Sequence, residues 1–243
     1  MVWENKLRKA SFEGVDFKLL KDQRAKVLKP ENYIPALSYN WLTPFYDTAV
    51  RLTTREKVFK GALVEQAKIE ANHRVLDLAC GTGTLAILIK NAQPQAAVVG
   101  IDGDAKILGI AKTKAKESGV EIRFDKGMSF DLPYENESFD RVISSLFFHH
   151  LTRENKLKTL WEIKRVLKPE GEFHIADFGS PKNFLMKFPS YFIKLLDGSE
   201  TTADSFNGLL PKLIMDAGLE AVQETDSFNS LFGTIRLHKS RKI

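Results

Sequence analysis

The chain has 243 residues, of which 43% are hydrophobic, with a net charge of +5 and a single cysteine. A chain of this length and apolar content buries a full core, and none of its apolar runs reaches the roughly eighteen residues that cross a membrane. One cysteine excludes an internal disulfide and a cysteine-cluster metal site, and we expect no bound metal. The charged N-terminus has no apolar signal core, so we expect a cytoplasmic protein.

Basic residues are concentrated at the start of the chain. Residues 1–29 hold eight Lys or Arg against four Asp or Glu, which accounts for +4 of the total charge of +5. A solvated extension explains this composition, while peripheral contact with a membrane surface or with nucleic acid stays open. We predict that residues 1–72 form this extension and a helical cap, with a helix over 54–68, and that residues 73–243 form a second domain.

From Arg74 onward the sequence alternates between strand and helix, which is typical of a parallel sheet with crossover helices. The last two strand-like runs, joined by Ser227–Ser230, predict an antiparallel hairpin. Ser180-Pro181 predicts the start of a further helix. The predicted strands are 74–79, 97–102, 121–125, 140–146, 172–178, 219–226 and 231–238, and the predicted helices are 83–92, 104–118, 153–167 and 206–217.

A glycine-rich turn follows the first of these strands. Gly81 and Gly83 open the next helix, and the second strand ends at Asp102. Glycines allow the backbone to approach a ligand closely. A carboxylate at the end of the next parallel strand lies beside the same cleft and accepts hydrogen bonds from ribose hydroxyls. The spacing therefore predicts a site for an adenosine-containing cofactor.

The segment Gly81–Ala86 also fits the dinucleotide pattern GxGxx(G/A). Asp77, inside the preceding strand, argues against a dinucleotide. A carboxylate there would repel an anionic pyrophosphate, whereas it would attract a sulfonium that carries an ammonium group.

Four motifs in order, from Val75 to about Gly179, resemble those of class I S-adenosylmethionine-dependent methyltransferases, with the ubiquinone/menaquinone C-methyltransferase group as the nearest relatives. The motifs are Asp77–Gly83, Gly100-Ile101-Asp102, Leu132-Pro133-Tyr134 with Ser138-Phe139-Asp140, and Arg165–Gly171. The resemblance implies an α/β, Rossmann-like, seven-stranded, mostly parallel sheet with a C-terminal antiparallel hairpin and an N-terminal helical cap. It also implies S-adenosyl-L-methionine as cofactor and S-adenosyl-L-homocysteine as product. The methyl group would pass to an O, C or N nucleophile of a small, apolar acceptor.

Ten residues are predicted to bind the cofactor. Where relatives often have Gly-Asp-Ala, this chain has Gly127-Met128-Ser129, so we expect Met128 to pack on the adenine and the Ser129 backbone to bond the ring. Tyr46 resembles a tyrosine that reaches over the methionyl end in quinone-type relatives, and a packing role is equally open. The ten are Tyr46, Asp77, Ala79, Gly81, Gly83, Asp102, Gly103, Met128, Ser129 and Ser145.

His149 and His150, after the fourth strand, are the candidate catalytic residues. A neutral imidazole there takes a proton from a phenol or an enol; alternatively, one ring bonds a loop backbone and the other starts a helix. The segment Ser144–Leu151 lacks the Asn/Asp-Pro-Pro-Tyr/Phe tetrapeptide of enzymes that methylate nucleobase amines, which argues against nucleic acid as partner. An RNA-directed methyltransferase using the basic N-terminus, a non-catalytic S-adenosylmethionine-binding protein and a nicotinamide oxidoreductase stay open as alternatives.

Overall fold

The computed structural model describes residues 56–180, 208–230 and 233–243, all within a unit that spans Tyr39–Ile243. Tyr46, the basic segment and the helix predicted after Ser180 lie outside the described residues. One helix of the N-terminal region is described, α3 (Glu56–Ala67), which confirms the helix expected over 54–68.

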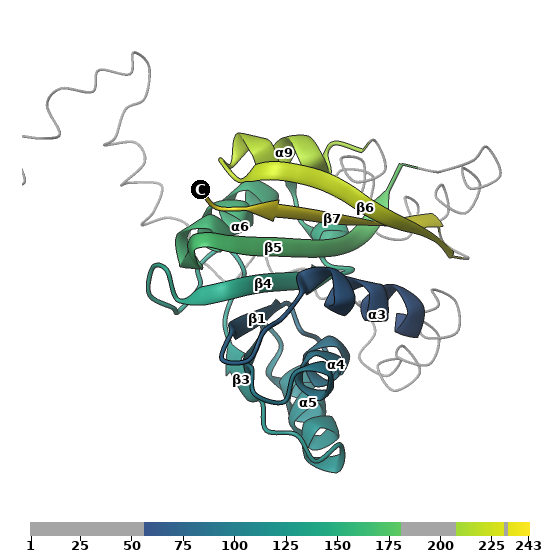
Figure 1. Cartoon of the computed structure of the whole chain (residues 1–243), viewed down its shortest axis with the longest axis vertical. Coiled ribbons are helices and arrows are strands. Elements are labelled where there is room, and N and C mark those ends of the chain that lie inside the picture. The colour runs from purple at the N-terminus through teal and green to yellow at the C-terminus, as the bar shows by residue number, and fades with distance from the viewer. Residues whose placement is uncertain (1–55, 181–207, 231–232) are drawn as a thin grey trace, which may run out of the picture. The chain divides into compact units, whose positions relative to one another are not determined.

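Seven strands form one sheet in the order β3-β2-β1-β4-β5-β7-β6 (Figure 1). The first five pair in parallel, and β7 pairs antiparallel with both β5 and β6. This topology confirms the predicted mostly parallel sheet with a C-terminal antiparallel hairpin. The strands are β1 (Arg74–Leu78), β2 (Ala97–Asp102), β3 (Arg123–Lys126), β4 (Phe139–Ser145), β5 (Leu167–Gly179), β6 (Glu220–Ser230) and β7 (Gly233–Arg241).

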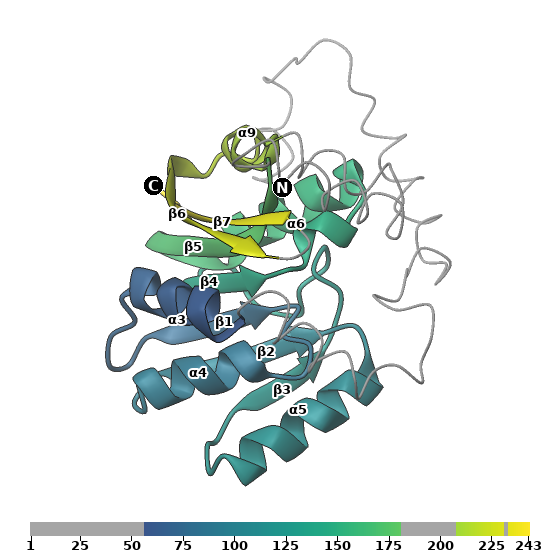
Figure 2. The same ribbon diagram turned by 90° about the vertical axis from the view of Figure 1, so that its right-hand side faces the viewer.

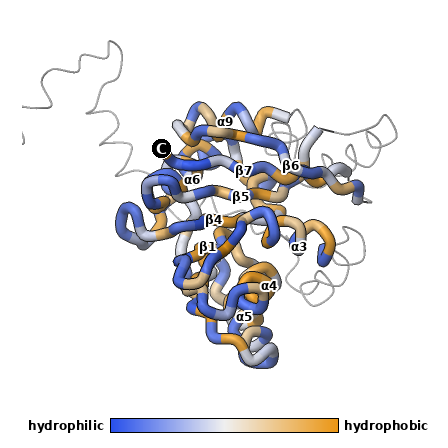
Figure 3. The backbone as a smooth tube through the Cα atoms, in the orientation of Figure 1, coloured by the Kyte–Doolittle hydropathy of each residue, from blue (hydrophilic) through white to orange (hydrophobic). Residues whose placement is uncertain are grey.

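Helices cover both faces of the sheet (Figure 2). Side chains alternate across a strand, so Val75 of β1 joins the core under α3, α4 (Thr84–Ala92) and α5 (Ala105–Glu117). Leu76 and Leu78 join the opposite core, with α6 (Arg153–Val166) and α9 (Leu210–Asp216). The hydropathy colours follow this division, because α4 is largely hydrophobic while the edge strand β6 is largely hydrophilic (Figure 3).

Capping residues set the start of two helices. The Asp104 side chain accepts hydrogen bonds from the backbone amides of Lys106 and Ile107 at the start of α5. The Thr152 side chain accepts one from Asn155 at the start of α6, as its sequence position predicted.

Several predicted boundaries are wrong, among them the start of α9, which lies at Leu210 and not at 206. The strand expected at 172 begins at Leu167, because the backbone leaves α6 directly into a pairing of Leu167 with Phe139 before a register shift. The third strand spans 123–126 rather than 121–125, since its pairing with β2 starts at Arg123. The hairpin does not turn over Ser227–Ser230.

The pairing of β6 with β7 continues through the predicted turn. Phe228 pairs with Ile235, and Ser230 pairs with Gly233. The Ser230 hydroxyl also donates to the Gly233 carbonyl at 2.8 Å, which fixes that last pair. The polar composition of Ser-Phe-Asn-Ser therefore belongs to an exposed edge strand and not to a loop.

Within residues 56–180, 208–230 and 233–243, every helix is too short or too polar to span a lipid bilayer.

Candidate active site

The loop after β1 is built from three residues in the left-handed backbone region. Ala79, Gly81 and Gly83 have φ angles of 56°, 53° and 77°. The strand ends at Leu78 because Ala79 leaves the extended conformation, one residue before the predicted end. Leu146, with φ 52°, ends β4 in the same way after Ser145. Since β1 and β4 are parallel neighbours, both turns lie at the carboxyl edge of the sheet.

The two loop glycines serve different purposes. A Cβ at Gly83 would lie 3.0 Å from the Cβ of Ala111 and 3.1 Å from the Phe124 ring, so this glycine allows α4 to approach α5 and β3. A Cβ at Gly81 would meet no atom of the described residues within 4 Å. The space beside Gly81 is therefore open to a ligand.

Cys80 comes directly before Gly81 and is buried against β2. Its backbone N–H donates to the Ile101 carbonyl at 2.9 Å. Its Sγ atom would lie 2.9 Å from a Cβ at Gly100, so only glycine fits that position of β2. Burial, and then the charges of Asp77 and Asp102, raise the pKa of the Cys80 thiol.

Asp102 fastens the glycine loop to the end of β2. Its Oδ2 accepts a hydrogen bond from the Gly81 amide at 3.0 Å, and its Oδ1 accepts one from the Asp104 amide at 2.9 Å. Burial raises the pKa of Asp102, and these two amides lower it. The carboxylate therefore has two backbone donors within the protein. Each oxygen keeps a second lone pair, which matches the two hydroxyls of a ribose.

Asp77 lies one strand away, on the sheet face that carries α3 and α4. Its side chain is buried, and among the described residues its Oδ2 has no hydrogen-bond partner. Burial raises the pKa of Asp77 to about 7, opposed by the charge of Lys60 and by a hydrogen bond from the Ala86 amide. An unpartnered buried carboxylate oxygen is costly, so this position fits a cationic ligand group.

The start of α4 completes this part of the site. Gly83 is its N-cap residue and offers no side-chain cap. The N-cap residue itself therefore supplies no acceptor, while the Ala86 amide bonds Asp77, and the helix dipole favours a negatively charged group at this end of α4.

The segment expected to contact adenine lies beside Asp102. The Gly127 amide donates to the Asp102 carbonyl at 3.1 Å, and Met128 pairs with Asp131 in a single bridge. Ser129 is buried, and its hydroxyl lies 2.9 Å from the Thr159 hydroxyl of α6. Its side chain therefore holds the segment against α6, and only its backbone is available to a ligand.

The two histidines follow β4 in a short 3-10 turn over Phe148–His150. His149 is buried, and its Nδ1 lies 2.6 Å from Oδ1 of Asp177 in β5. The two imidazole rings are 3.9 Å apart between centroids. Burial, and then the charge of His149, lower the pKa of His150 to about 3.

Asp177 is a residue that the sequence reasoning missed. Its Oδ2 accepts hydrogen bonds from the amides of Phe147, Phe148 and His149. Burial raises its pKa, but the charge and hydrogen bond of His149 and the Phe178 amide hold it below the ordinary value. The signal was present, because Asp177 is a carboxylate inside an apolar strand, as Asp77 is.

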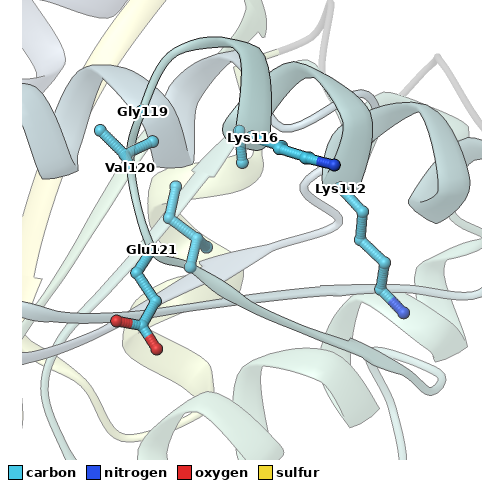
Figure 4. A pocket seen from close by; sticks show the side chains of 7 residues that line it. Lys112, Lys116, Gly119, Val120 and Glu121 are labelled. Carbon is cyan, nitrogen blue, oxygen red and sulfur yellow. The ribbon is translucent and has the colours of Figure 1, made fainter.

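The described residues contain no group of three or more His, Cys, Asp or Glu side chains arranged to hold a metal ion. An opening of about 420 Å³ lies elsewhere, between the end of α5 and the segment before β3 (Figure 4). It is lined by Lys112, Ala115, Lys116, Gly119, Val120, Glu121 and Ile122. Because these residues precede β3, the opening lies at the amino edge of the sheet, opposite the glycine loop.

Comparisons with known proteins agree with this geometry. The methyltransferase domain family matches residues 75–171, the segment that contains the glycine loop, Asp102 and the histidines. The chain is 33% identical to a demethylmenaquinone methyltransferase of Thermus thermophilus, over 65% of this chain and 73% of that protein. It is 31% identical to a demethylmenaquinone methyltransferase of Lactobacillus johnsonii, over 79% of this chain and 84% of that protein.

The fold has a solved counterpart in the YcgJ protein of Bacillus subtilis. The two structures superpose with a TM-score of 0.65 at 22% identity, over 75% of this chain and 97% of that one. The fold and the sequence relatives together define a methyltransferase of the Rossmann-like class. The chain belongs to the S-adenosylmethionine-dependent methyltransferase family, and within it is similar to the enzymes named demethylmenaquinone methyltransferases.

Proposed function

We propose that this methyltransferase binds S-adenosylmethionine at the carboxyl edge of β1 and β2 and methylates a small, apolar acceptor. The observation that carries the proposal is the buried Oδ2 of Asp77, which has no hydrogen-bond partner among the described residues. The ammonium group of the cofactor's methionyl end supplies a cation for it. An anionic dinucleotide pyrophosphate would be repelled.

The other predicted contacts extend along the same edge. Asp102 would take the ribose hydroxyls with its remaining lone pairs, and the open space at Gly81 would admit the chain between ribose and sulfur. Met128 and the Ser129 backbone would hold the adenine, while Ala79, Gly83, Gly103 and Ser145 would shape the walls. The contact predicted for Tyr46 stays a prediction.

The bound cofactor supplies an electrophilic methyl group on a sulfonium. The protein's part is to orient the acceptor nucleophile in line with that group and to exclude water. His149 is the candidate base for the proton of an acceptor hydroxyl, held in orientation by Asp177. His150 suits this task less, because a base with a pKa of about 3 takes a proton from a hydroxyl poorly.

A hydroxy-aromatic acceptor fits this chemistry best. Relatives that share about a third of the sequence are named for demethylmenaquinone, an apolar aromatic compound. Deprotonation of a ring hydroxyl makes both its oxygen and the adjacent ring carbon nucleophilic, so one base serves either O- or C-methylation. We propose a cytoplasmic location, with a small molecule as the partner.

The test is calorimetric titration of the full chain with S-adenosylmethionine, S-adenosylhomocysteine and NADH, followed by transfer of labelled methyl to naphthoquinols and phenols. We expect binding of the two adenosyl-sulfur ligands alone and transfer to an aromatic hydroxyl compound. Binding of NADH alone would overturn the proposal. If the protein binds S-adenosylhomocysteine but transfers methyl only to RNA, the acceptor is a nucleic acid and not a small molecule. If it binds S-adenosylhomocysteine and transfers methyl to neither, it is a non-catalytic binding protein.

A further inference from the structure

Helix α3 points its first turn at the carboxyl edge of the sheet. At its other end, the Ala67 carbonyl accepts a hydrogen bond from Arg141 Nε at 2.9 Å, and Arg141 lies in the amino half of β4. A helix of 12 residues is roughly 18 Å long, so the opposite end of α3 reaches the edge where the glycine loop lies. Figure 2 shows α3 alongside β1 and α4.

That first turn carries a buried ion pair. The Lys60 ammonium lies 2.5 Å from Oε1 of Glu56, and the two side chains are 11% and 12% exposed. An i,i+4 pair of this kind ordinarily lies on the solvent side of a helix, since the desolvation of two charges is costly. Here the pair lies on the buried face of α3, together with Phe59 and Leu63.

Asp77 lies within electrostatic reach of the Lys60 ammonium. Across the described residues, Glu56 is the one hydrogen-bond partner of Lys60, which leaves two of its three N–H donors available. The unpartnered Oδ2 of Asp77 is an acceptor without a donor. The Lys60 ammonium and the Asp77 carboxylate are thus two buried groups of opposite charge near the glycine loop. Each can form further hydrogen bonds.

We propose that Lys60 and Asp77 together bind the zwitterionic amino-acid end of the cofactor, with Lys60 taking the carboxylate and Asp77 the ammonium. This inference rests on the proposed function. Glu56 holds Lys60 in position before the ligand binds and competes with the ligand carboxylate afterwards. When all three side chains are ionised they carry one net negative charge, which the positive sulfonium of the methylated cofactor balances. The site therefore selects ligands with an intact amino-acid tail.

The test compares two ligands that differ in this tail. S-Adenosylhomocysteine has it, whereas 5′-methylthioadenosine lacks it and keeps the adenosine and the sulfur. We expect Lys60→Met to weaken S-adenosylhomocysteine binding at least 30-fold by calorimetry while changing methylthioadenosine binding less than twofold. Glu56→Gln removes the competing carboxylate and is expected to tighten S-adenosylhomocysteine binding severalfold without affecting methylthioadenosine.

Lys57→Met is the matched control, because Lys57 is an exposed lysine on the same helix and should change neither affinity. An equal loss for both ligands in Lys60→Met would make Lys60 a structural residue and overturn the inference, as would no loss for either. If Lys60→Met does not fold, the decarboxylated cofactor, which retains only the ammonium, gives the same comparison in the unaltered protein. Equal affinity for it and for S-adenosylhomocysteine overturns the role of Lys60. Failure of the unaltered protein to bind S-adenosylhomocysteine at all would instead overturn the proposed function.

Discussion

The Nδ1 atom of His149 lies 2.6 Å from Oδ1 of Asp177, and the second oxygen of the same carboxylate accepts the backbone amides that begin the turn carrying His149. An ionised carboxylate only accepts hydrogen bonds, so Nδ1 carries the proton of the neutral imidazole. Nε2 is then the basic atom. One carboxylate in β5 therefore fixes the backbone, the ring orientation and the tautomer together.

Replacement of His149 by Gln should lower the rate of methyl transfer by roughly 10² to 10⁴, the usual contribution of a general base. Affinity for S-adenosylhomocysteine should stay within twofold, because the histidine faces the acceptor and not the cofactor in this proposal. Single-turnover transfer and calorimetry on the same preparations measure the two quantities. His150→Gln is the matched control and should retain most of the rate, since the pKa of His150 is lowered to about 3. If the two variants lose rate equally, the base role of His149 is wrong.

The loop glycines offer a second comparison. Gly81→Ala places a methyl group in open space at a φ of 53°, so it should cost about 1–2 kcal/mol in stability and weaken cofactor binding strongly. Gly83→Ala adds contacts at 3.0 and 3.1 Å to the same backbone strain, so its larger effect should be on stability. Urea unfolding and calorimetry separate the two effects.

Gly109 provides the control for these substitutions. It lies within α5, and a Cβ there would meet no atom within 4 Å in the part of the chain that the structure describes. Gly109→Ala should therefore stabilise the protein by roughly 0.5–1 kcal/mol and leave binding unchanged. Unaltered cofactor affinity in Gly81→Ala would show that the ligand does not approach that position.

Asp102 should both hold the glycine loop in place and bind the ribose of the ligand. Asp102→Ala removes the acceptor of the Gly81 amide together with the ribose contact, and we expect at least a 100-fold loss of S-adenosylhomocysteine affinity. Asp102→Asn keeps one acceptor oxygen and should lose less. Circular dichroism checks that both variants are folded. Equal, near-normal affinities in both would contradict the ribose assignment.

Asp77 should give the folded protein a pH-dependent stability. Its folded pKa of about 7 exceeds the ordinary value of 3.8, so between these pH values the folded chain holds a proton that the unfolded chain has lost. The Asp77 contribution to stability is therefore present below pH 4 and declines as the pH rises through 7. Asp77→Asn removes the decline, which amounts to at most about 4 kcal/mol.

The measurement is the free energy of unfolding of both proteins from pH 4.5 to 8. The difference between variant and parent isolates Asp77, because His150 and the other titrating groups are common to both. If the difference in unfolding free energy between the two proteins does not change with pH, burial does not raise the pKa of the Asp77 carboxyl. Ligand binding gives a second readout, since an ionised Asp77 is needed for the ammonium and affinity should rise with pH up to about 7.

Much of the sheet was predictable from sequence because its signals are local. Apolar runs such as Ala97–Ile101, separated by glycine turns and amphipathic helices, identified each parallel strand, and Thr152 marked the start of α6 correctly. The errors occur where pairing with a strand distant in sequence determines the strand boundary. Leu167 becomes a strand residue only because Phe139 lies beside it, and Ser227–Ser230 has turn composition but is paired with β7.

The candidate site shows the same division. Gly81, Gly83 and Asp102 follow from spacing along one βαβ unit, so the sequence brings them together without a structure. Asp177 lies in β5, a different element from the turn that carries His149, and Lys60 lies in α3, a different element from the strand that carries Asp77. A charged residue in a helix, such as Lys60, is indistinguishable in sequence from a solvated one until the helix direction is known.

Cys80, the single thiol of the chain, is enclosed between the glycine loop and β2, and its raised pKa keeps it protonated and slow to react. Alkylation of Cys80 therefore requires the loop to leave β2, which breaks the Gly81–Asp102 hydrogen bond. The rate of Cys80 alkylation in the unmodified protein therefore reports how often the loop opens. A ligand that holds the loop closed should lower this alkylation rate in proportion to the fraction of protein that is bound. The measurement needs neither an introduced probe nor methyl transfer.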